Sequence, residues 1–100
     1  MQIETVQTDE LEGKALEWAV LKAIGGSWPE GVHSTWDKAG YLITNLNIFL
    51  SSGGHKFMFI AYLDERAPSV GRSLPEAVYR AVVHSVMGSW ISVPVSLLKT

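Results

Sequence analysis

The stretch from residue 73 to residue 94 constrains the fold most, because it has the pattern of a helix that leads directly into a strand. Small and β-branched residues recur there at the spacing of one helix face. These residues are Leu74, Ala77, Val78, Ala81, Val82, Ser85 and Val86. We therefore expect this face, with Val78 and Val82 at its centre, to form part of the core.

Both ends of this helix carry recognisable signals. Ser73 and Glu76 match the S-x-x-E capping box, in which each side chain bonds to the backbone N–H of the other residue. Gly88 is expected to end the helix in the left-handed conformation, which glycine adopts without steric penalty. Residues 90–93 then read as a short strand, and Pro94 is expected to end its ladder.

The first third of the chain predicts a strand and a second helix. Residues 2–6 fit a short strand, and an apolar stripe with i, i+3, i+4 spacing predicts a helix over about residues 9–24. The paired glycines Gly25 and Gly26 are expected to end it. The apolar residues within 27–40 show neither the helical nor the strand period, which is typical of a loop.

The middle of the chain predicts strands. Residues 41–50 are ambiguous, but alternation in their second half favours a strand, and residues 51–54 read as a turn. Residues 56–63 are apolar on both faces, as in a central strand covered on both sides. Residues 64–72 read as a polar loop. The fold class expected is α+β: two helices packed on a small, mostly antiparallel β-sheet, in the order β-α-β-β-α-β.

Composition narrows the classes of function. One hundred residues fit a single domain, residues 1–100, and the net charge of −2 makes direct nucleic-acid binding unexpected. No signal-peptide pattern opens the chain, and no apolar run approaches the roughly 20 residues of a membrane helix. The absence of cysteine suits a reducing compartment. We expect a cytoplasmic protein that does not contact a membrane.

The ionisable residues do not predict a catalytic, metal or cofactor site. His33, His55 and His84 are far apart in the sequence, and none has the i, i+4 partner of a helical metal site. The glycine pairs Gly25-Gly26 and Gly53-Gly54 match neither the Walker A phosphate loop nor the G-x-G-x-x-G motif of dinucleotide-binding proteins. We therefore expect no enzymatic activity, no cofactor and no bound metal.

Two tryptophans in an aperiodic loop are the most informative surface signal. Either Trp28 and Trp36 fold back as a lid over the core, or one of them is an exposed anchor for a partner, since tryptophan is enriched in binding hot spots. The second alternative predicts a partner-binding face. Its residues are Trp28, Trp36, Asp37, Tyr41 and Arg66.

A second apolar surface lies beside the core stripe of the last helix. Tyr79, Val83 and Met87 widen that stripe beyond one narrow face. Either the sheet and the first helix cover them, or they form a surface for self-association, so a homodimer stays open as a prediction.

Several segments resemble the phage NinX-like family. Residues 11–25, LEGKALEWAVLKAIG, resemble its opening pattern L-x-G-x-x-L-D-W-A-V-A-K-A-x-G. Residues 33–36 stand where the family has Tyr-Ser-Thr followed by tryptophan, residues 73–88 match its second helix, and residues 93–98 resemble its V-x-V-P-x-x-L ending. The resemblance implies a phage or prophage origin and expression inside a bacterium. It implies no biochemical activity, because the family has no settled one.

Three functional hypotheses follow. The first is a small phage-encoded protein that binds a bacterial host protein or complex, for example as an inhibitor of a defence complex such as a CRISPR effector. The second is a small ligand-binding domain or enzyme that uses His33, Trp36 and Asp37 around a pocket. The third is a phage accessory protein whose main property is self-association.

Overall fold

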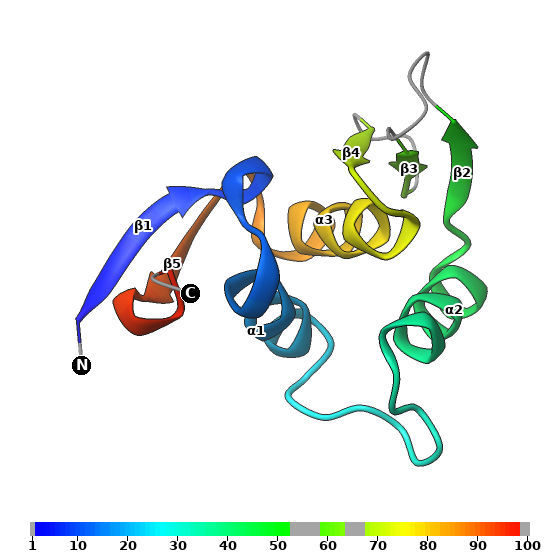
Figure 1. Ribbon diagram of the computed structural model, residues 1–100, viewed down its shortest axis with the longest axis horizontal. Helices are drawn as coiled ribbons and strands as arrows, with labels where there is room; N and C mark the ends of the chain where they lie inside the picture. The colour runs from blue at the N-terminus through cyan, green and yellow to red at the C-terminus, as the bar shows by residue number, and fades with distance from the viewer. Residues whose placement is uncertain (1, 53–58, 64–67, 99–100) are drawn as a thin grey trace.

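The computed structural model describes residues 2–52, 59–63 and 68–98, with a radius of gyration of 12.9 Å (Figure 1). The described helices are η1 (Thr8–Glu10), α1 (Gly13–Ala23), α2 (Thr35–Leu46), α3 (Leu74–Met87) and η2 (Val95–Leu97). The described strands are β1 (Ile3–Gln7), β2 (Phe49–Ser52), β3 (Phe59–Tyr62), β4 (Ser69–Gly71) and β5 (Trp90–Pro94). The fold is therefore α+β, as expected, but it has three α-helices and two antiparallel sheets in place of two helices and one sheet.

The helix α3 is the element around which the others pack. Figure 1 shows it near the middle, with α1 and α2 on one side and β3 and β4 on the other. Val78 and Val82, predicted to lie at the centre of its core face, are fully buried. Tyr79 and Val83 are buried as well, so neighbouring elements cover most of the wider apolar surface. The prediction was wrong for Val86, which is 56% exposed.

The caps of α3 differ in detail from the sequence pattern. Ser73 Oγ accepts a hydrogen bond from the backbone N–H of Glu76 at 3.3 Å. The Glu76 carboxylate, however, accepts from the N–H of Arg72 at 3.2 Å, not from that of Ser73. Gly88 has φ 87° and ψ −165°, a region that is open almost only to glycine and is not the left-handed helical one.

The strands form two separate sheets because β5 pairs with the other end of the chain. In the first sheet β1 and β5 are antiparallel, with Ile3 opposite Pro94 and Gln7 opposite Trp90. The second has the order β2-β3-β4, with Ala61 of β3 between Leu50 and Ser69. On the inner face Ala61 and Ser69 are buried, while Phe49 and Val70 on the outer face are exposed. The sequence had suggested a central strand covered on both faces. The described part of β3 is central in its sheet, as predicted, but the outer face of that sheet is not fully covered.

The prediction of a loop over residues 27–40 was wrong from residue 35 onward, where α2 begins. Ala39 and Leu42 of α2 are buried, and α2 packs against α3, so tertiary burial stabilises a helix whose sequence includes Gly40 and Thr44. Asn47 ends α2 in the left-handed conformation. The strand expected in residues 41–50 is confirmed only from Phe49.

Two further boundaries differ. Ser69–Gly71 pair as β4 inside the expected polar loop, and Ser51 and Ser52 belong to β2, not to a turn. Residues 53–54 of that turn and 64–67 of that loop lie outside the described residues.

The first helix starts four residues later than predicted. Thr8 is fully buried, donates from Oγ1 to the carbonyl of Gly88 at 2.7 Å, and donates its N–H to the carbonyl of Ser89 at 2.8 Å. These bonds hold residues 8–10 in a 3-10 turn against the end of α3, so α1 cannot begin until Gly13.

Candidate functional site

The structure separates the predicted partner-binding residues. Trp36 lies in the first turn of α2 with its side chain 65% exposed. Trp28 is partly buried against the core, and its ring meets the Tyr41 ring edge-on with centroids 6.3 Å apart. Trp28 thus has the lid position, whereas Trp36 has the exposed one. Arg66 lies outside the described residues.

Asp37 holds the start of α2. Its carboxylate accepts from the N–H of Ser34 at 3.2 Å and of His33 at 3.5 Å, while Ser34 Oγ accepts from the N–H of Asp37 at 3.0 Å. This is a reciprocal capping box. The backbone bonds from Ser34 and then His33 hold the pKa of the Asp37 carboxyl below its ordinary value of 3.8. His33 is exposed and donates its backbone N–H to Asp37, so these two residues serve the helix cap.

A cleft of about 360 Å³ lies where the first turns of α1, α2 and α3 meet. Its apolar lining comes from Leu16, Pro75 and Tyr79, and its polar lining from Lys14, Glu17, Thr35, Ser73 and Glu76. Its volume is at the lower end of the range of small-molecule sites. Three helix starts from distant parts of the chain therefore surround one hollow.

Tyr79 is the unusual residue of this cleft. Its side chain is 3% exposed, and among the described residues its hydroxyl has no hydrogen-bond partner. Burial, and then the negative charge of Glu17, raise the pKa of Tyr79 to about 12. The hydroxyl therefore stays protonated at neutral pH.

The acidic residues of the cleft are paired with basic ones. Glu17 lies 3.5 Å from Nζ of Lys38, and Glu76 lies 2.9 Å from Nη1 of Arg80. Lys14 has no ion-pair partner among the described residues. The charged side chains that line the cleft are therefore one cation, Lys14, and two carboxylates, whose partners Lys38 and Arg80 lie outside the lining.

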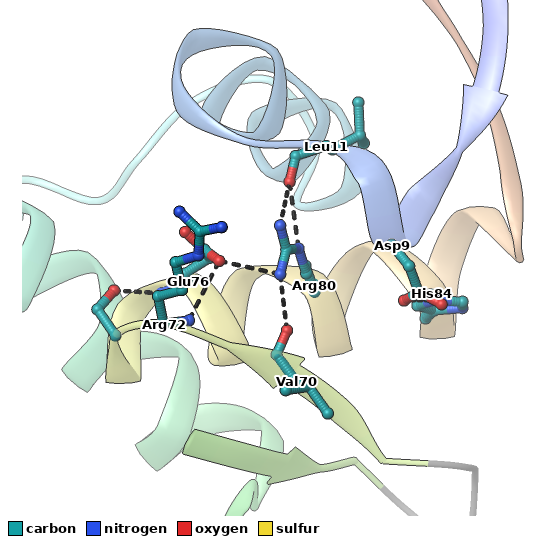
Figure 2. Close-up of polar contacts among 8 residues, drawn as sticks. Asp9, Leu11, Val70, Arg72, Glu76, Arg80 and His84 are labelled. Atoms are coloured by element: carbon teal, nitrogen blue, oxygen red, sulfur yellow. Dashed lines mark hydrogen bonds and ion pairs between the residues drawn. The ribbon is translucent and has the colours of Figure 1, made fainter. Parts of the chain in front are cut away.

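Arg80 connects this region to the rest of the fold (Figure 2). Its Nε and Nη2 donate to the carbonyl of Leu11 at 3.1 and 2.8 Å, and its Nη1 donates to the carbonyl of Val70 at 2.8 Å. One guanidinium thus ties α3 to the segment before α1 and to β4. Behind it, Nε2 of His84 lies 2.7 Å from Asp9 Oδ1, so His84 is an ion-pair residue at the surface.

Neither a metal site nor a membrane span is found in the described parts of the chain. Within residues 2–52, 59–63 and 68–98, no three His, Asp or Glu side chains are grouped so that they could hold a metal ion. None of the helices described there has the length and apolar character needed to cross a bilayer.

Comparison with known proteins gives no relative. No protein-family model, no curated protein and no solved structure matches this chain. The resemblance to the NinX-like family therefore stays a prediction that depends on the segments quoted above.

Sequence reasoning did not find the cleft. Tyr79 was noticed only as an apolar residue, and Lys14, Thr35 and Ser73 were not connected with it. One local signal was present, because Ser34 and Asp37 have the spacing of a capping box and place a helix start at Thr35. The meeting of three helix starts depends on tertiary packing, which no local pattern encodes.

Proposed function

We propose that this chain is a binding protein without enzymatic activity, and that it docks on a bacterial host protein through Trp36. The observation that carries the proposal is an indole 65% exposed on the first turn of a capped helix. Burying an exposed indole in a partner's apolar pocket is favourable, and tryptophan is enriched among residues that dominate binding energy.

The setting of Trp36 supports this role. The Ser34–Asp37 capping box fixes the turn that carries the indole, so little backbone freedom is lost when a partner binds. Gly40 and Thr44 lie at i+4 and i+8 and are exposed, and a Cβ built on Gly40 meets no atom within 4 Å. The helix surface beside the indole therefore carries small exposed residues and is open to a second protein.

The identity of the host target follows from the resemblance and not from the geometry. A phage or prophage origin, and expression in the bacterial cytoplasm, are what the NinX-like segments imply. Inhibition of a host defence complex is the specific form of this proposal, because a chain of 100 residues with net charge −2 has the size and charge of a protein that acts by occupying a surface.

The test compares two exposed tryptophans. The parent, Trp36→Ala and Trp90→Ala are immobilised and exposed to a bacterial lysate, and a captured protein is purified for affinity measurements. Trp90 is the matched control, because its side chain is 58% exposed on β5. We expect Trp36→Ala to weaken binding about 30-fold or more, which corresponds to a hot spot of ~2 kcal/mol, and Trp90→Ala to bind like the parent.

One result would contradict the proposed role of Trp36. If Trp36→Ala bound the captured protein as tightly as the parent, Trp36 would not be the anchor. Thermal melts of both variants accompany the experiment, and we expect them to match the parent because neither indole is buried.

A further inference from the structure

The strand β1 has an outer edge with which no described element pairs. Within the described chain it is hydrogen-bonded to β5 alone, and Figure 1 places it at the periphery of the molecule. All its residues except Val6 are exposed. The backbone N–H and carbonyl groups of a free edge are a template for another strand. The outer edge of β1 therefore has the form of a strand-pairing surface.

Two hydrogen bonds fix which residues of β1 face β5. At one end of the pair the N–H of Val95 donates to the carbonyl of Gln2 at 3.0 Å, and at the other end the N–H of Thr8 donates to the carbonyl of Ser89 at 2.8 Å. Bonded and non-bonded residues alternate along an antiparallel pair. The even-numbered residues of β1 therefore bond to β5, and the odd-numbered ones direct their backbone groups outward.

The outward residues are Ile3, Thr5 and Gln7. Pro94, which lies opposite Ile3, has no N–H, in agreement with this alternation. The side chains of these three residues share one face of the strand, where Thr5 Oγ1 lies 3.0 Å from Ser92 Oγ. Ile3 is 62% exposed on that face. A row of unpaired backbone groups is thus combined with an exposed apolar side chain.

The two edges of this sheet are not protected equally. On the outer edge of β5, Pro94 removes one N–H, and α1 packs against this strand. Natural edge strands are commonly blocked by proline or lysine, or covered by another element. The strand β1 contains neither residue, and its one charged residue, Glu4, directs its backbone groups toward β5. We therefore expect the edge of β1 to be covered in an assembly.

We propose that β1 pairs edge to edge with β1 of a second copy of this chain, antiparallel about a two-fold axis at Thr5. In this register Thr5 lies opposite Thr5 of the partner subunit, and Ile3 lies opposite Gln7 of the partner subunit. All three outward residues then form bonded pairs, each exchanging both of its N–H···O bonds. The two sheets become one sheet with the order β5-β1-β1-β5.

Self-complementarity of the strand favours a second copy as the occupant. Threonine opposite threonine is a favourable cross-strand pair, and Glu4 lies opposite Val6 of the partner subunit. A shift of two residues in either direction leaves Ile3 or Gln7 without a partner, and one of these shifts places Glu4 directly opposite its own copy, where like charges repel. A two-stranded sheet is also only marginally stable, so the larger sheet is favoured.

The test measures the oligomeric state of the intact chain and the protection of its edge amides. Sedimentation equilibrium is recorded up to about 1 mM, the limit at which a weak dimer is still detected. We expect a dimer whose fraction rises with concentration. In hydrogen exchange followed by NMR, the amides of Ile3, Thr5 and Gln7 should be protected only at dimer concentrations, whereas Glu4 and Val6 should be protected at all concentrations because they bond to β5.

A proline pair separates the edge of β1 from that of β5. Thr5→Pro removes an outward N–H and should raise the dissociation constant of the dimer about 10-fold or more. Ser92→Pro removes the outward N–H opposite it on β5 and should leave the dimer intact. Both variants lose the hydroxyl contact between Thr5 and Ser92, and proline is tolerated where an edge N–H faces solvent.

A lysine pair tests the axis without changing the backbone. Thr5→Lys places two ammonium groups opposite each other and should also weaken the dimer about 10-fold or more. Gln7→Lys makes the same charge change on the same face but lies opposite Ile3 of the partner subunit, so its effect should be smaller. Thermal melts show which variants are folded, and the lysine pair decides if a proline variant is not.

Three results would overturn the inference. The first is a chain that stays monomeric up to about 1 mM, which would leave the edge to a strand of another protein or to none. The second is a dimer in which the amides of Ile3, Thr5 and Gln7 exchange freely, which would mean that another surface self-associates. The third is a dimer that Thr5→Lys leaves unchanged. The docking role of Trp36 is tested separately, because Trp36 lies on α2 and Trp36→Ala does not alter β1.

Discussion

Replacing Tyr79 by phenylalanine should stabilise this protein, although the residue lies in its core. The substitution deletes a hydroxyl that is buried and has no partner among the described residues, and it keeps the ring that packs against the core. Leaving a buried polar group unpaired is unfavourable by about 1–3 kcal/mol. We therefore expect the free energy of unfolding to rise by about 1 kcal/mol or more, and the melting temperature to rise by roughly 4–8 °C for each kcal/mol.

Thr8 offers the opposite case and is the control. Its hydroxyl is equally buried, but it donates to the carbonyl of Gly88 at 2.7 Å. Thr8→Val removes that bond while conserving shape, and it leaves the carbonyl without this donor, so we expect a loss of about 1–3 kcal/mol. The two variants, measured by urea and thermal unfolding near pH 7, should move in opposite directions.

The pH dependence of the free energy of unfolding above pH 10 gives an independent test of the unpaired hydroxyl. The pKa of Tyr79 is raised to about 12 in the folded chain from an ordinary value of 10.0, so between these values the unfolded state loses the proton and the folded state keeps it. The stability of the parent should therefore fall between pH 10 and pH 12, and Tyr79→Phe should lack this part of the decline. A Tyr79→Phe variant that was less stable than the parent at pH 7 by 1 kcal/mol or more would refute the reasoning, because it would reveal a partner for the hydroxyl.

Four further substitutions test individual parts of the fold. Gly71→Ala should destabilise the fold by about 1–3 kcal/mol or more, because a Cβ there would lie within 3.0 Å of the backbone of Ala77. Gly40→Ala is the control: a Cβ there meets nothing within 4 Å, so the free energy of unfolding should rise by about 0.5–1 kcal/mol. Urea unfolding compares the two variants. Arg80→Lys should lose roughly 2–4 kcal/mol in the same assay, since lysine cannot donate to the carbonyls of Leu11 and Val70 together, and an unchanged midpoint would mean that the guanidinium contacts contribute nothing. Asp37→Asn should be less stable than the parent at pH 7. Because the pKa of Asp37 is lowered in the folded chain, this difference in stability should disappear as the pH falls through that pKa, below 3.8. A difference that persisted there would exclude the carboxylate charge as its cause.

The parts of the fold that were predictable have local signals. The helix α3 has a core stripe and a serine cap, and both the buried valines and the strand after Gly88 are confirmed. The helix α2 was missed because Gly40, Thr44 and Asn45 weaken its intrinsic preference, while burial of Ala39 and Leu42 against α3 stabilises it. Local signals of this helix are the capping box at Ser34 and Asp37 and the i, i+3, i+4 spacing of Ala39, Leu42 and Ile43, but the aperiodic stretch before residue 35 obscures them.

The remaining features depend on contacts between distant residues. Pairing of β1 with β5 joins residues 3 and 94, and the Arg80 guanidinium reaches Leu11, 69 positions away. Neither contact leaves a trace in the sequence around either residue. The cleft has the same origin, because its lining comes from residues near 14, 35 and 75. Predicting it would have required the packing of α1 and α2 on α3.

Trp36 and Tyr79 both depart from the usual pattern of a folded protein. Trp36 exposes an indole to water, and Tyr79 keeps a buried hydroxyl unpaired. Thr35, which precedes Trp36 in the sequence, lines the cleft whose wall is Tyr79. In folded proteins, departures from good packing and full hydrogen bonding tend to be retained where function requires them.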